Sequence, residues 1–425
     1  MSDSIDSIID KRTDVRCVLV SAVPSGVDQH YYEASLDELE RLADTAGAVV
    51  CARLIQNKQS PDPATYIGSG KLTELAELCR NNEVTLAVFD CELSPSQIRN
   101  IEDGLGDGIT AIDRSMLILD IFALHATTAE GKLQVELAQL KYTVPRLIGK
   151  GKAMSRLGGG IGTRGPGESQ LETDKRHIKR RMDALEDELK SLKNIRAVQR
   201  AQRDSSGIFK IAIAGYTNAG KSTILNYLTD AGILAQDMLF ATLDPTTRKY
   251  ELPCGQQVLL TDTVGFIRNL PHHLIEAFRS TLDEVVYADA VMVVIDSSDP
   301  EAYAQLEVTR SLIEDLGAGA KPILYVCNKS DIAEPVGTNT VTADTVFVSA
   351  KTGEGMDTLV AALERMAQEG KKKYTFFFCH NDAGMVNFLY SSATDVTVEY
   401  LADGISATAV CDAKTAGKLK RFIKD

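Results

Sequence analysis

Residues 215–222, GYTNAGKS, have the types and the spacing that binding a nucleoside triphosphate requires. Glycines at positions one and six of such a loop let consecutive backbone N–H groups curl around a β-phosphate. Lys221 can reach the β- and γ-phosphate oxygens, and the Ser222 hydroxyl can bind magnesium at a helix N-terminus. The apolar run at residues 208–215 and the helix-forming run from Lys221 onward supply the flanking strand and helix. The pattern predicts a phosphate-binding P-loop.

A second stretch, VLLTDTVGF at residues 258–266, has the features of a strand that ends at a γ-phosphate. Asp262 would help to hold the magnesium ion, and the backbone of Gly265 would contact the γ-phosphate. The residue after this glycine is often the glutamine that orients the attacking water, but here it is Phe266, which can neither donate nor accept for that water. We therefore expect slow intrinsic hydrolysis that depends on a partner or a rearranged switch, with Phe266→Gln as the direct probe.

Two further stretches select the base. In NKSD, residues 328–331, Asn328 can bond the O6/N7 edge of guanine, Lys329 can lie over the base, and Asp331 can accept from N1–H and the 2-amino group. Adenine does not present this pair of donors, so the aspartate would be desolvated and unpaired. VSAK, residues 348–351, would add a backbone N–H to guanine O6. All four elements in this order predict a guanine-nucleotide-binding domain.

Between the first two stretches, FATLDPTTR at residues 240–248 should contain the switch threonine that closes on magnesium and the γ-phosphate. Thr242, Thr246 and Thr247 are all candidates by position. A segment that only the γ-phosphate orders is released by hydrolysis, so this stretch is expected to switch.

The elements before the P-loop alternate between strands and helices. Strands are expected at residues 16–22, 47–54, 84–90 and 109–113, and helices at residues 32–45, 70–81 and 94–104. The last helix has Ser94 as its N-cap and Pro95 in its first turn. This alternation predicts a small parallel α/β domain.

A glycine-rich stretch at residues 157–169 leads into a long polar helix with an apolar seam at spacings of three, four or seven residues. The seam consists of Leu171, Ile178, Met182, Leu185, Leu189 and Leu192. The seam suits either a hairpin partner in the same chain, for which a helix at residues 130–142 is a candidate, or a short coiled coil. Residues 203–207 are expected to form a linker. After a charged break at residues 371–373, strands at 374–379, 393–401 and 405–411, a helix at 383–392 and a final basic helix suggest an α+β appendage.

The expected fold class is therefore α/β, with a P-loop domain of mixed, mostly parallel sheet that has helices on both faces. We predict an N-terminal α/β domain at residues 1–140, a basic glycine-rich loop with a helical hairpin at 130–203, the nucleotide-binding domain at 207–370 and a small α+β domain at 373–425.

Composition points to a cytoplasmic protein. The chain has 425 residues and a net charge of −13, which argues against a general nucleic-acid coat protein. Residues 141–181 nevertheless contain eleven Lys or Arg against three Asp or Glu, so that segment is +8 and the remainder −21. The eight scattered cysteines suggest reduced, mostly buried thiols rather than disulfides or a zinc site, and no signal peptide or membrane span is expected. Nothing demands more than a monomer.

With the switch region and the first domain in view, the chain closely resembles the HflX-type translational GTPases. The matching stretches outside the motifs above are residues 63–75, 92–102, 113–147 and 156–182. The resemblance selects Thr242 in FATLD as the magnesium-binding threonine. It also implies a factor that binds the large ribosomal subunit, with its rRNA, and that helps to rescue or split stalled ribosomes.

On this basis the expected catalytic residues are Lys221, Thr242 and Gly265. Magnesium would be bound directly by Ser222 and Thr242, while Asp262 would hold these ligands without contacting the ion itself. The complete predicted nucleotide site consists of Gly215, Tyr216, Thr217, Asn218, Ala219, Gly220, Lys221, Ser222, Thr223, Phe240, Ala241, Thr242, Leu243, Asp244, Asp262, Thr263, Val264, Gly265, Asn328, Lys329, Ser330, Asp331, Ser349, Ala350 and Lys351.

The basic segment agrees with binding to an RNA backbone, because phosphates are contacted mostly by Lys, Arg and backbone N–H groups. The candidate contacts are Lys150, Lys152, Arg156, Arg164, Lys175, Arg176, Arg180 and Arg181. The alternative interpretation of these basic residues is a helix face that is exposed to solvent and binds no RNA. The alternative function of the whole protein is a nucleotide-switched adaptor that recruits a protein partner.

YIGSGK, residues 66–71, is interpreted as the start of a helix rather than as a second nucleotide site, because Leu72 stands where a hydroxyl is needed.

Overall fold

The computed structural model describes residues 15–24, 26, 29–147, 170–205, 208–229, 239–240, 244–269, 271, 274, 279–332, 345–369, 371–411 and 413–424. The chain forms two compact units. The first contains Met1–Lys190, Asp237–Leu243 and Arg268–Phe278, and the second contains Ser191–Gln236, Asp244–Ile267 and Arg279–Asp425.

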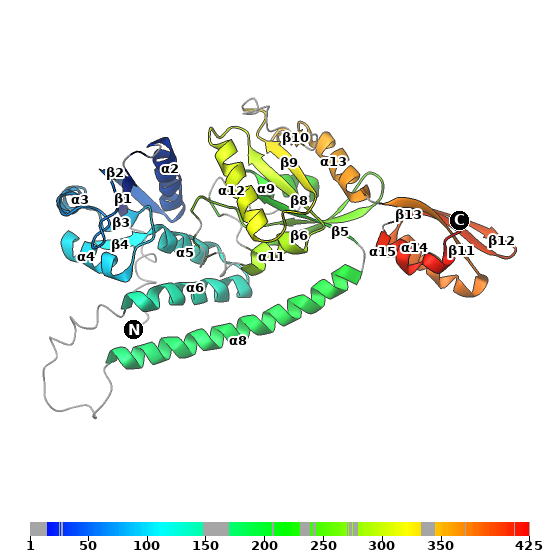
Figure 1. The fold of residues 1–425 in the computed structure, drawn as a ribbon, viewed down its shortest axis with the longest axis horizontal. Helices are drawn as coiled ribbons and strands as arrows, with labels where there is room; N and C mark the ends of the chain where they lie inside the picture. The colour runs from blue at the N-terminus through cyan, green and yellow to red at the C-terminus, as the bar shows by residue number, and fades with distance from the viewer. Residues whose placement is uncertain are drawn as a thin grey trace. The chain divides into compact units, whose positions relative to one another are not determined.

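The first unit begins with the parallel sheet that the alternating pattern predicts. Its strands are β1 (Val15–Pro24), β2 (Ala48–Lys58), β3 (Leu86–Phe89) and β4 (Thr110–Asp113), in the order β2-β1-β3-β4. The helices α2 (Gln29–Thr45), α3 (Ser69–Asn81) and α4 (Pro95–Leu105) confirm the three predicted helices (Figure 1). The Ser94 cap is confirmed too, since its Oγ accepts from the Gln97 amide at 3.2 Å and Gln97 Oε1 accepts from the Ser94 amide at 2.9 Å.

Helix α5 (Arg114–His125) follows β4 directly and has no counterpart among the predicted elements. Its N-cap is Asp113, whose carboxylate accepts from the Met116 amide at 2.9 Å. Leu117, Ile118 and Phe122 are all buried, and apolar side chains lie around most of the helix. A helix that is buried on every side lacks the one-sided apolar stripe by which helices are recognised in a sequence.

Helix α6 (Ala129–Leu147) pairs with the first half of α8 (Gln170–Ser205), as the apolar seam predicts (Figure 1). Leu185 and Leu189 are buried, and two ion pairs of 2.7 Å, Arg181–Glu136 and Lys141–Glu186, join the two helices. The prediction of a linker at residues 203–207 is wrong for residues 203–205, which continue the helix. The glycine-rich stretch at 157–169 lies outside the described residues.

The second unit contains a six-stranded sheet in the order β10-β9-β8-β5-β7-β6, in which only β6 runs antiparallel to its neighbour. The strands are β5 (Phe209–Gly215), β6 (Thr246–Glu251), β7 (Gln257–Asp262), β8 (Ala290–Asp296), β9 (Ile323–Asn328) and β10 (Thr345–Phe347). The helices are α9 (Lys221–Thr229), α11 (Arg279–Tyr287), α12 (Ala302–Asp315) and α13 (Met356–Gln368).

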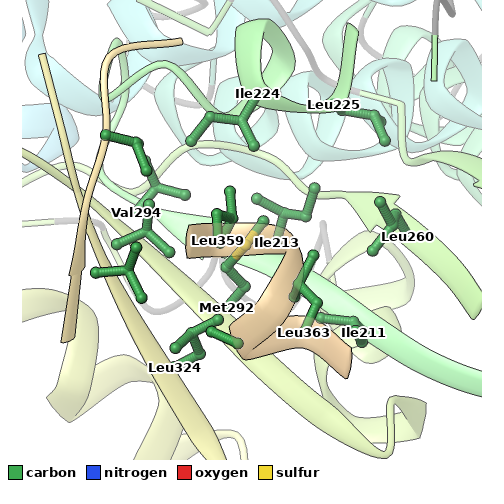
Figure 2. Packing of buried hydrophobic residues seen from close by; sticks show 14 of the residues in the cluster. Ile211, Ile213, Ile224, Leu225, Leu260, Met292, Val294, Leu324, Leu359 and Leu363 are labelled. Atoms are coloured by element: carbon green, nitrogen blue, oxygen red, sulfur yellow. The ribbon is translucent and has the colours of Figure 1, made fainter. Parts of the chain in front are cut away.

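One face of this sheet carries the main apolar core of the unit. Figure 2 shows Ile224 of α9 and Leu359 of α13 beside Ile213, Met292 and other buried strand residues. Helices α11 and α12 contact strands β5 and β8 of the same sheet. The mixed, mostly parallel sheet of the predicted fold class is confirmed.

The last part of the chain forms an antiparallel sheet in the order β11-β13-β12, from β11 (Lys372–Phe378), β12 (Thr394–Leu401) and β13 (Gly404–Cys411). Helices α14 (Gly384–Ser392) and α15 (Ala413–Lys418) contribute Leu389 and Ala416 to its core, which includes Phe376 and Phe378. The predicted strands and the helix at 383–392 are confirmed. The charged break is not a separate segment, because Lys372 already belongs to β11.

No helix within the described residues is long and apolar enough to cross a membrane. None of the eight cysteines, all of which lie within the described residues, forms a disulfide bond. The expectation that they are mostly buried is wrong, because Cys254 and Cys379 are exposed and three others are half-buried.

Candidate nucleotide site

The loop between β5 and α9 depends on glycine at both of its ends. Gly215 has φ +147°, and a β-carbon there would lie 2.3 Å from the carbonyl oxygen of Val294. Gly220 has φ +93°, and a β-carbon there would lie 2.1 Å from Nδ2 of Asn328. Neither position can hold a larger residue without moving its neighbours, so the glycines of the predicted P-loop are explained by close packing as well as by backbone conformation.

Lys221 is buried at the start of α9, and its ammonium group is turned onto the loop. Its Nζ donates to the carbonyl oxygens of Gly215 at 3.2 Å and Tyr216 at 2.8 Å. Burial lowers the pKa of Lys221 to about 8, while the nearby carboxylate of Asp262 opposes this shift. The loop thus encloses a cation that an incoming anionic group would stabilise.

Ser222 and Asp262 meet across the end of the sheet. The Ser222 hydroxyl donates to Oδ2 of the buried Asp262 at 2.6 Å. A hydroxyl beside a carboxylate is a set of oxygen donors of the kind that magnesium binds. The structure therefore brings together two of the three residues predicted to hold the metal ion. Within the described residues no cluster of three or more His, Cys, Asp or Glu suggests another metal site.

Gly265 lies against the P-loop. A β-carbon at this position would be 2.6 Å from Cγ2 of Thr217 and 3.0 Å from Nζ of Lys221. The predicted γ-phosphate contact and the predicted phosphate-binding lysine are therefore neighbours in the fold. Only a residue without a side chain can approach so closely.

Phe266 is fully buried, so the role inferred for its side chain from sequence needs correction. Its amide donates to the carbonyl of Gly215 at 3.1 Å, and its carbonyl accepts from the Thr217 amide at 2.8 Å. These bonds form a short parallel bridge between the P-loop and the residue after Gly265. The ring is a core residue here, and it does not occupy an open position at which a glutamine could orient water.

The two residues between Asp262 and Gly265 also point inward. Thr263 is buried, and its hydroxyl donates to the carbonyl of Ile213 at 2.8 Å, while Val264 is almost fully buried. Their predicted part in a nucleotide site is thus limited to the backbone. Thr223 is half-buried in the first turn of α9.

Asn328 joins the P-loop to the loop after β10. Its Nδ2 donates to the carbonyl of Ala219 at 2.9 Å, and its Oδ1 accepts from the Ala350 amide at 3.1 Å. Ser349 is fully buried, and its Oγ accepts from the Thr352 amide at 3.2 Å. The sequence predicted Asn328 and Ala350 as separate contacts to the base, whereas the structure also bonds them to each other.

Lys329 is oriented by a residue that the sequence analysis did not single out. Its Nζ lies 2.6 Å from Oδ2 of Asp296, at the end of β8, and its own φ is +62°. The Ser330 amide donates to the carbonyl of Val348 at 3.1 Å, while Asp331 and Lys351 are exposed. Asp296 carries no motif of its own, although its place at the carboxyl end of a central strand could have suggested it.

The structure describes two of the three candidate switch threonines. Thr246 and Thr247 belong to β6, and the Thr247 hydroxyl is 3.0 Å from that of Thr261. Ala241, Thr242 and Leu243 lie outside the described residues, while Asp244 is half-buried. Phe240 is buried with φ +57°, and in the first unit its ring packs edge-on against Phe122 with centroids 4.6 Å apart.

Half of the predicted RNA contacts lie outside the described residues, namely Lys150, Lys152, Arg156 and Arg164. The others lie on α8, where Arg176 and Arg180 are exposed and Lys175 is half-buried. Arg181 forms two bonds of 2.7 Å with the carboxylate of Glu136, so its guanidinium is paired within the α6–α8 hairpin.

The YIGSGK stretch, residues 66–71, is the start of a helix, as predicted. Gly68 immediately precedes α3, and its amide donates to Gln56 Oε1 at 2.8 Å.

Three family profiles match consecutive parts of the chain. Residues 33–123 match the GTP-binding GTPase N-terminal region, residues 125–203 the GTP-binding GTPase Middle Region, and residues 210–329 the 50S ribosome-binding GTPase profile.

Full-length relatives match as well. A GTPase HflX of Lacrimispora saccharolytica is 49% identical over 401 residues, which cover 94% of each chain. GTPase HflX of Escherichia coli is 40% identical over 340 residues, 79% of each chain. A GTP-binding protein from the hyperthermophilic archaeon Sulfolobus solfataricus, solved in complex with GDP, is 27% identical, covers 83% of this chain and 99% of its own, and superposes with a TM-score of 0.44. By its similarity to the bacterial relatives over most of their length, the chain belongs to the HflX family of GTPases, and its P-loop domain hydrolyses GTP.

Proposed function

We propose that this GTPase binds the large ribosomal subunit in its GTP-bound form and acts there to rescue or split stalled ribosomes. The single observation that carries the nucleotide part is the convergence of the predicted motifs at the carboxyl ends of parallel strands of one sheet. The P-loop follows β5, Asp262 ends β7, Asn328 ends β9 and Ser349 follows β10. This edge is where open α/β sheets bind their ligands.

In the proposed hydrolysis Lys221 holds charge that develops on the β–γ bridge and the γ-phosphate oxygens. The backbone amide of Gly265 donates to the γ-phosphate from the opposite side of the loop. Both groups are preorganised, because Lys221 is fixed by the carbonyls of Gly215 and Tyr216, and Gly265 is packed on Thr217. Neither residue supplies a base for the attacking water, so we propose that contact with the ribosome completes the site.

The donors fit a magnesium ion. We propose that the Ser222 hydroxyl and Thr242 bind it directly and that Asp262, 2.6 Å from the Ser222 hydroxyl, orients these groups from behind. The ion would neutralise charge on the β- and γ-phosphates. The Ser222 O–H group would keep donating to Asp262 while a lone pair of its oxygen binds the cation.

For the base, we propose that Asp331 accepts from guanine N1–H and the 2-amino group and that the aliphatic part of Lys329 covers the ring. The 2.6 Å ion pair between Lys329 and Asp296 supports this role, because it restrains the Lys329 side chain. Asn328 would add a bond to guanine while it continues to brace the two loops.

For the ribosome, the support is the +8 segment within an otherwise acidic chain and the description of the matched GTPase profile as 50S ribosome-binding. We propose that exposed basic residues of α8, Arg176 and Arg180 first, contact rRNA phosphates together with the basic residues that precede the helix. The protein would act as a cytoplasmic monomer.

Co-sedimentation with purified large subunits tests the proposal. The chain should pellet with subunits in a non-hydrolysable GTP analogue and much less in GDP, and subunits should accelerate GTP turnover. Lys221→Met is the matched control, since it should lose the nucleotide dependence. Equal turnover with and without subunits would exclude a ribosome-stimulated GTPase and favour the adaptor. Light scattering on intact ribosomes then separates splitting from binding alone.

A further inference from the structure

The turn that follows strand β8 lies beside the NKSD motif within the second unit. In the sheet, Asp296 at the end of β8 pairs with Asn328 at the end of β9. The Ser297 amide donates to the carbonyl of Asn328 at 2.9 Å. The fold therefore places Asp296, which belongs to none of the four nucleotide-binding motifs, next to Lys329, the second residue of NKSD.

The Asp296 carboxylate is held by its own turn. Its Oδ1 accepts from the Ser298 amide at 3.0 Å and from the Ser298 hydroxyl at 2.6 Å. An aspartate that bonds to the backbone two residues later forms an Asx turn, which fixes the direction of the carboxylate. The other oxygen, Oδ2, is thereby directed to the Lys329 ammonium, which is 2.6 Å away.

Lys329 is a residue that gains from such a restraint. A lysine side chain has a flexible four-carbon stem and loses much rotamer freedom when it is ordered. The Lys329 side chain is 26% exposed and that of Asp296 is 12% exposed, so this pair is better shielded from solvent than an ordinary surface ion pair. The backbone of Lys329 has φ +62°, a conformation that costs free energy in a residue other than glycine. The bond to Asp296 thus holds both a long side chain and a strained backbone in one conformation.

We infer that Asp296 and Ser298 are positioning residues that set how tightly, and for how long, this GTPase holds a guanine nucleotide. They act through Lys329, whose side chain they keep in place before the base arrives, so that binding does not have to order it. The inference rests on the proposed position of Lys329 over the guanine ring. It assigns control over the release of GDP to the turn after β8.

The first test measures the affinity and the dissociation rate of fluorescent GDP in variants of the intact chain. Asp296→Asn removes the charge of the carboxylate, and Ser298→Ala removes the hydroxyl that holds it but leaves the charges in place. Each should bind GDP about three- to tenfold more weakly, mainly through faster dissociation. Ser298→Thr keeps the hydroxyl and should stay near the wild type. Asp299→Asn is the matched control, because its carboxylate accepts instead from the Glu301 amide at 2.8 Å and from Gln305 Nε2 at 2.9 Å.

Two competing ligands separate this role from general damage to the site. IDP has the ring that Lys329 covers but lacks the 2-amino group of guanine, so the variants should weaken IDP and GDP by the same factor. Pyrophosphate contacts the P-loop alone, and its affinity should not change. A loss of pyrophosphate affinity, or a larger loss for GDP than for IDP, would overturn the inference, because it would place the damage at the P-loop or at Asp331.

A double-mutant cycle tests whether the effect passes through Lys329. Asp296→Asn should weaken GDP binding in the wild-type background and should change nothing further in the Lys329→Met background. Additive losses would overturn the inference. If Lys329→Met itself binds GDP like the wild type, the proposed role of Lys329 fails first. If Lys329→Met binds weakly while Asp296→Asn and Ser298→Ala bind normally, only the inference about the turn fails.

Discussion

The amide of Phe266 donates to the carbonyl oxygen of Gly215 at 3.1 Å, while the phenylalanine ring is completely buried. Phe266→Gln therefore places an amide in the core. We expect it to destabilise the chain by about 2–4 kcal/mol and to leave ribosome-free GTP turnover unchanged or lower. Urea unfolding and GTP turnover on the same sample measure both effects. Phe266→Leu is the control, which should cost less stability and keep the turnover rate.

A rise in ribosome-free hydrolysis in Phe266→Gln would contradict this expectation. It would mean that the segment leaves the core in the active state and that the side chain then reaches the attacking water.

We expect the buried Lys221 to make nucleotide affinity depend on pH. Its pKa is lowered to about 8 in the free site by burial, whereas phosphates favour the charged form, so binding at higher pH must take up a proton. The affinity for GDP should fall about fourfold between pH 7 and 8.5. Fluorescent GDP titrations at several pH values measure the slope. Lys221→Met should bind weakly and show none of this dependence, and an equal slope in that variant would assign the effect to another group.

Asp120, on α5, should lower the stability of the fold at neutral pH. Burial raises its pKa to about 7, although the bond from Gln139 Nε2 at 3.3 Å opposes the shift. A carboxyl group that titrates higher in the folded chain costs stability progressively as pH rises from about 4 to 7 and fully above that. Asp120→Asn should therefore stabilise the protein by about 1–3 kcal/mol at pH 8 and by less at pH 5. Urea unfolding midpoints of the wild type and Asp120→Asn at the two pH values measure the effect, with the exposed Asp103→Asn as the control. If the stability gained by Asp120→Asn does not increase with pH, the prediction is wrong.

Arg180 and Arg181 are adjacent in sequence but not equivalent. Arg180 is exposed, whereas Arg181 is bonded twice to Glu136. Arg180→Ala should weaken binding to large subunits and reduce the slope of log affinity against log salt by about 0.7–1. Arg181→Ala should change that slope less and instead loosen the hairpin of α6 and α8. Sedimentation at several salt concentrations measures the slopes, and equal slopes for the two variants would remove the distinction.

The motifs could be read from the sequence because each combines a strand end with a fixed order of residue types. Gly215, Lys221, Asp262 and Asn328 were found in this way, and the fold brings them to one edge of one sheet. The alternation of elements likewise predicted the first sheet. These are local patterns, and the physics behind them acts over a few residues.

What sequence reasoning missed depends on contacts between distant residues. The burial of Phe266 and the pairing of Arg181 with Glu136, 45 positions away, leave no periodic signal. Helix α5 was missed because it is apolar on nearly every side, and the linker was placed too early because its polar residues continue a helix. Asp296 contacts Lys329 from a different strand, so it lies in no recognisable motif.

The two bonds of Asn328 constrain how this enzyme can change. One amide group links the carbonyl of Ala219 in the P-loop to the amide of Ala350 in the loop after β10, which we propose faces the base. In the proposed site, recognition of the base and the conformation of the P-loop therefore both depend on the Asn328 side chain. A substitution of Asn328 that changed the base preference would also remove the bond to the P-loop, so we expect new preferences to arise at Asp331 or Lys351, which are exposed.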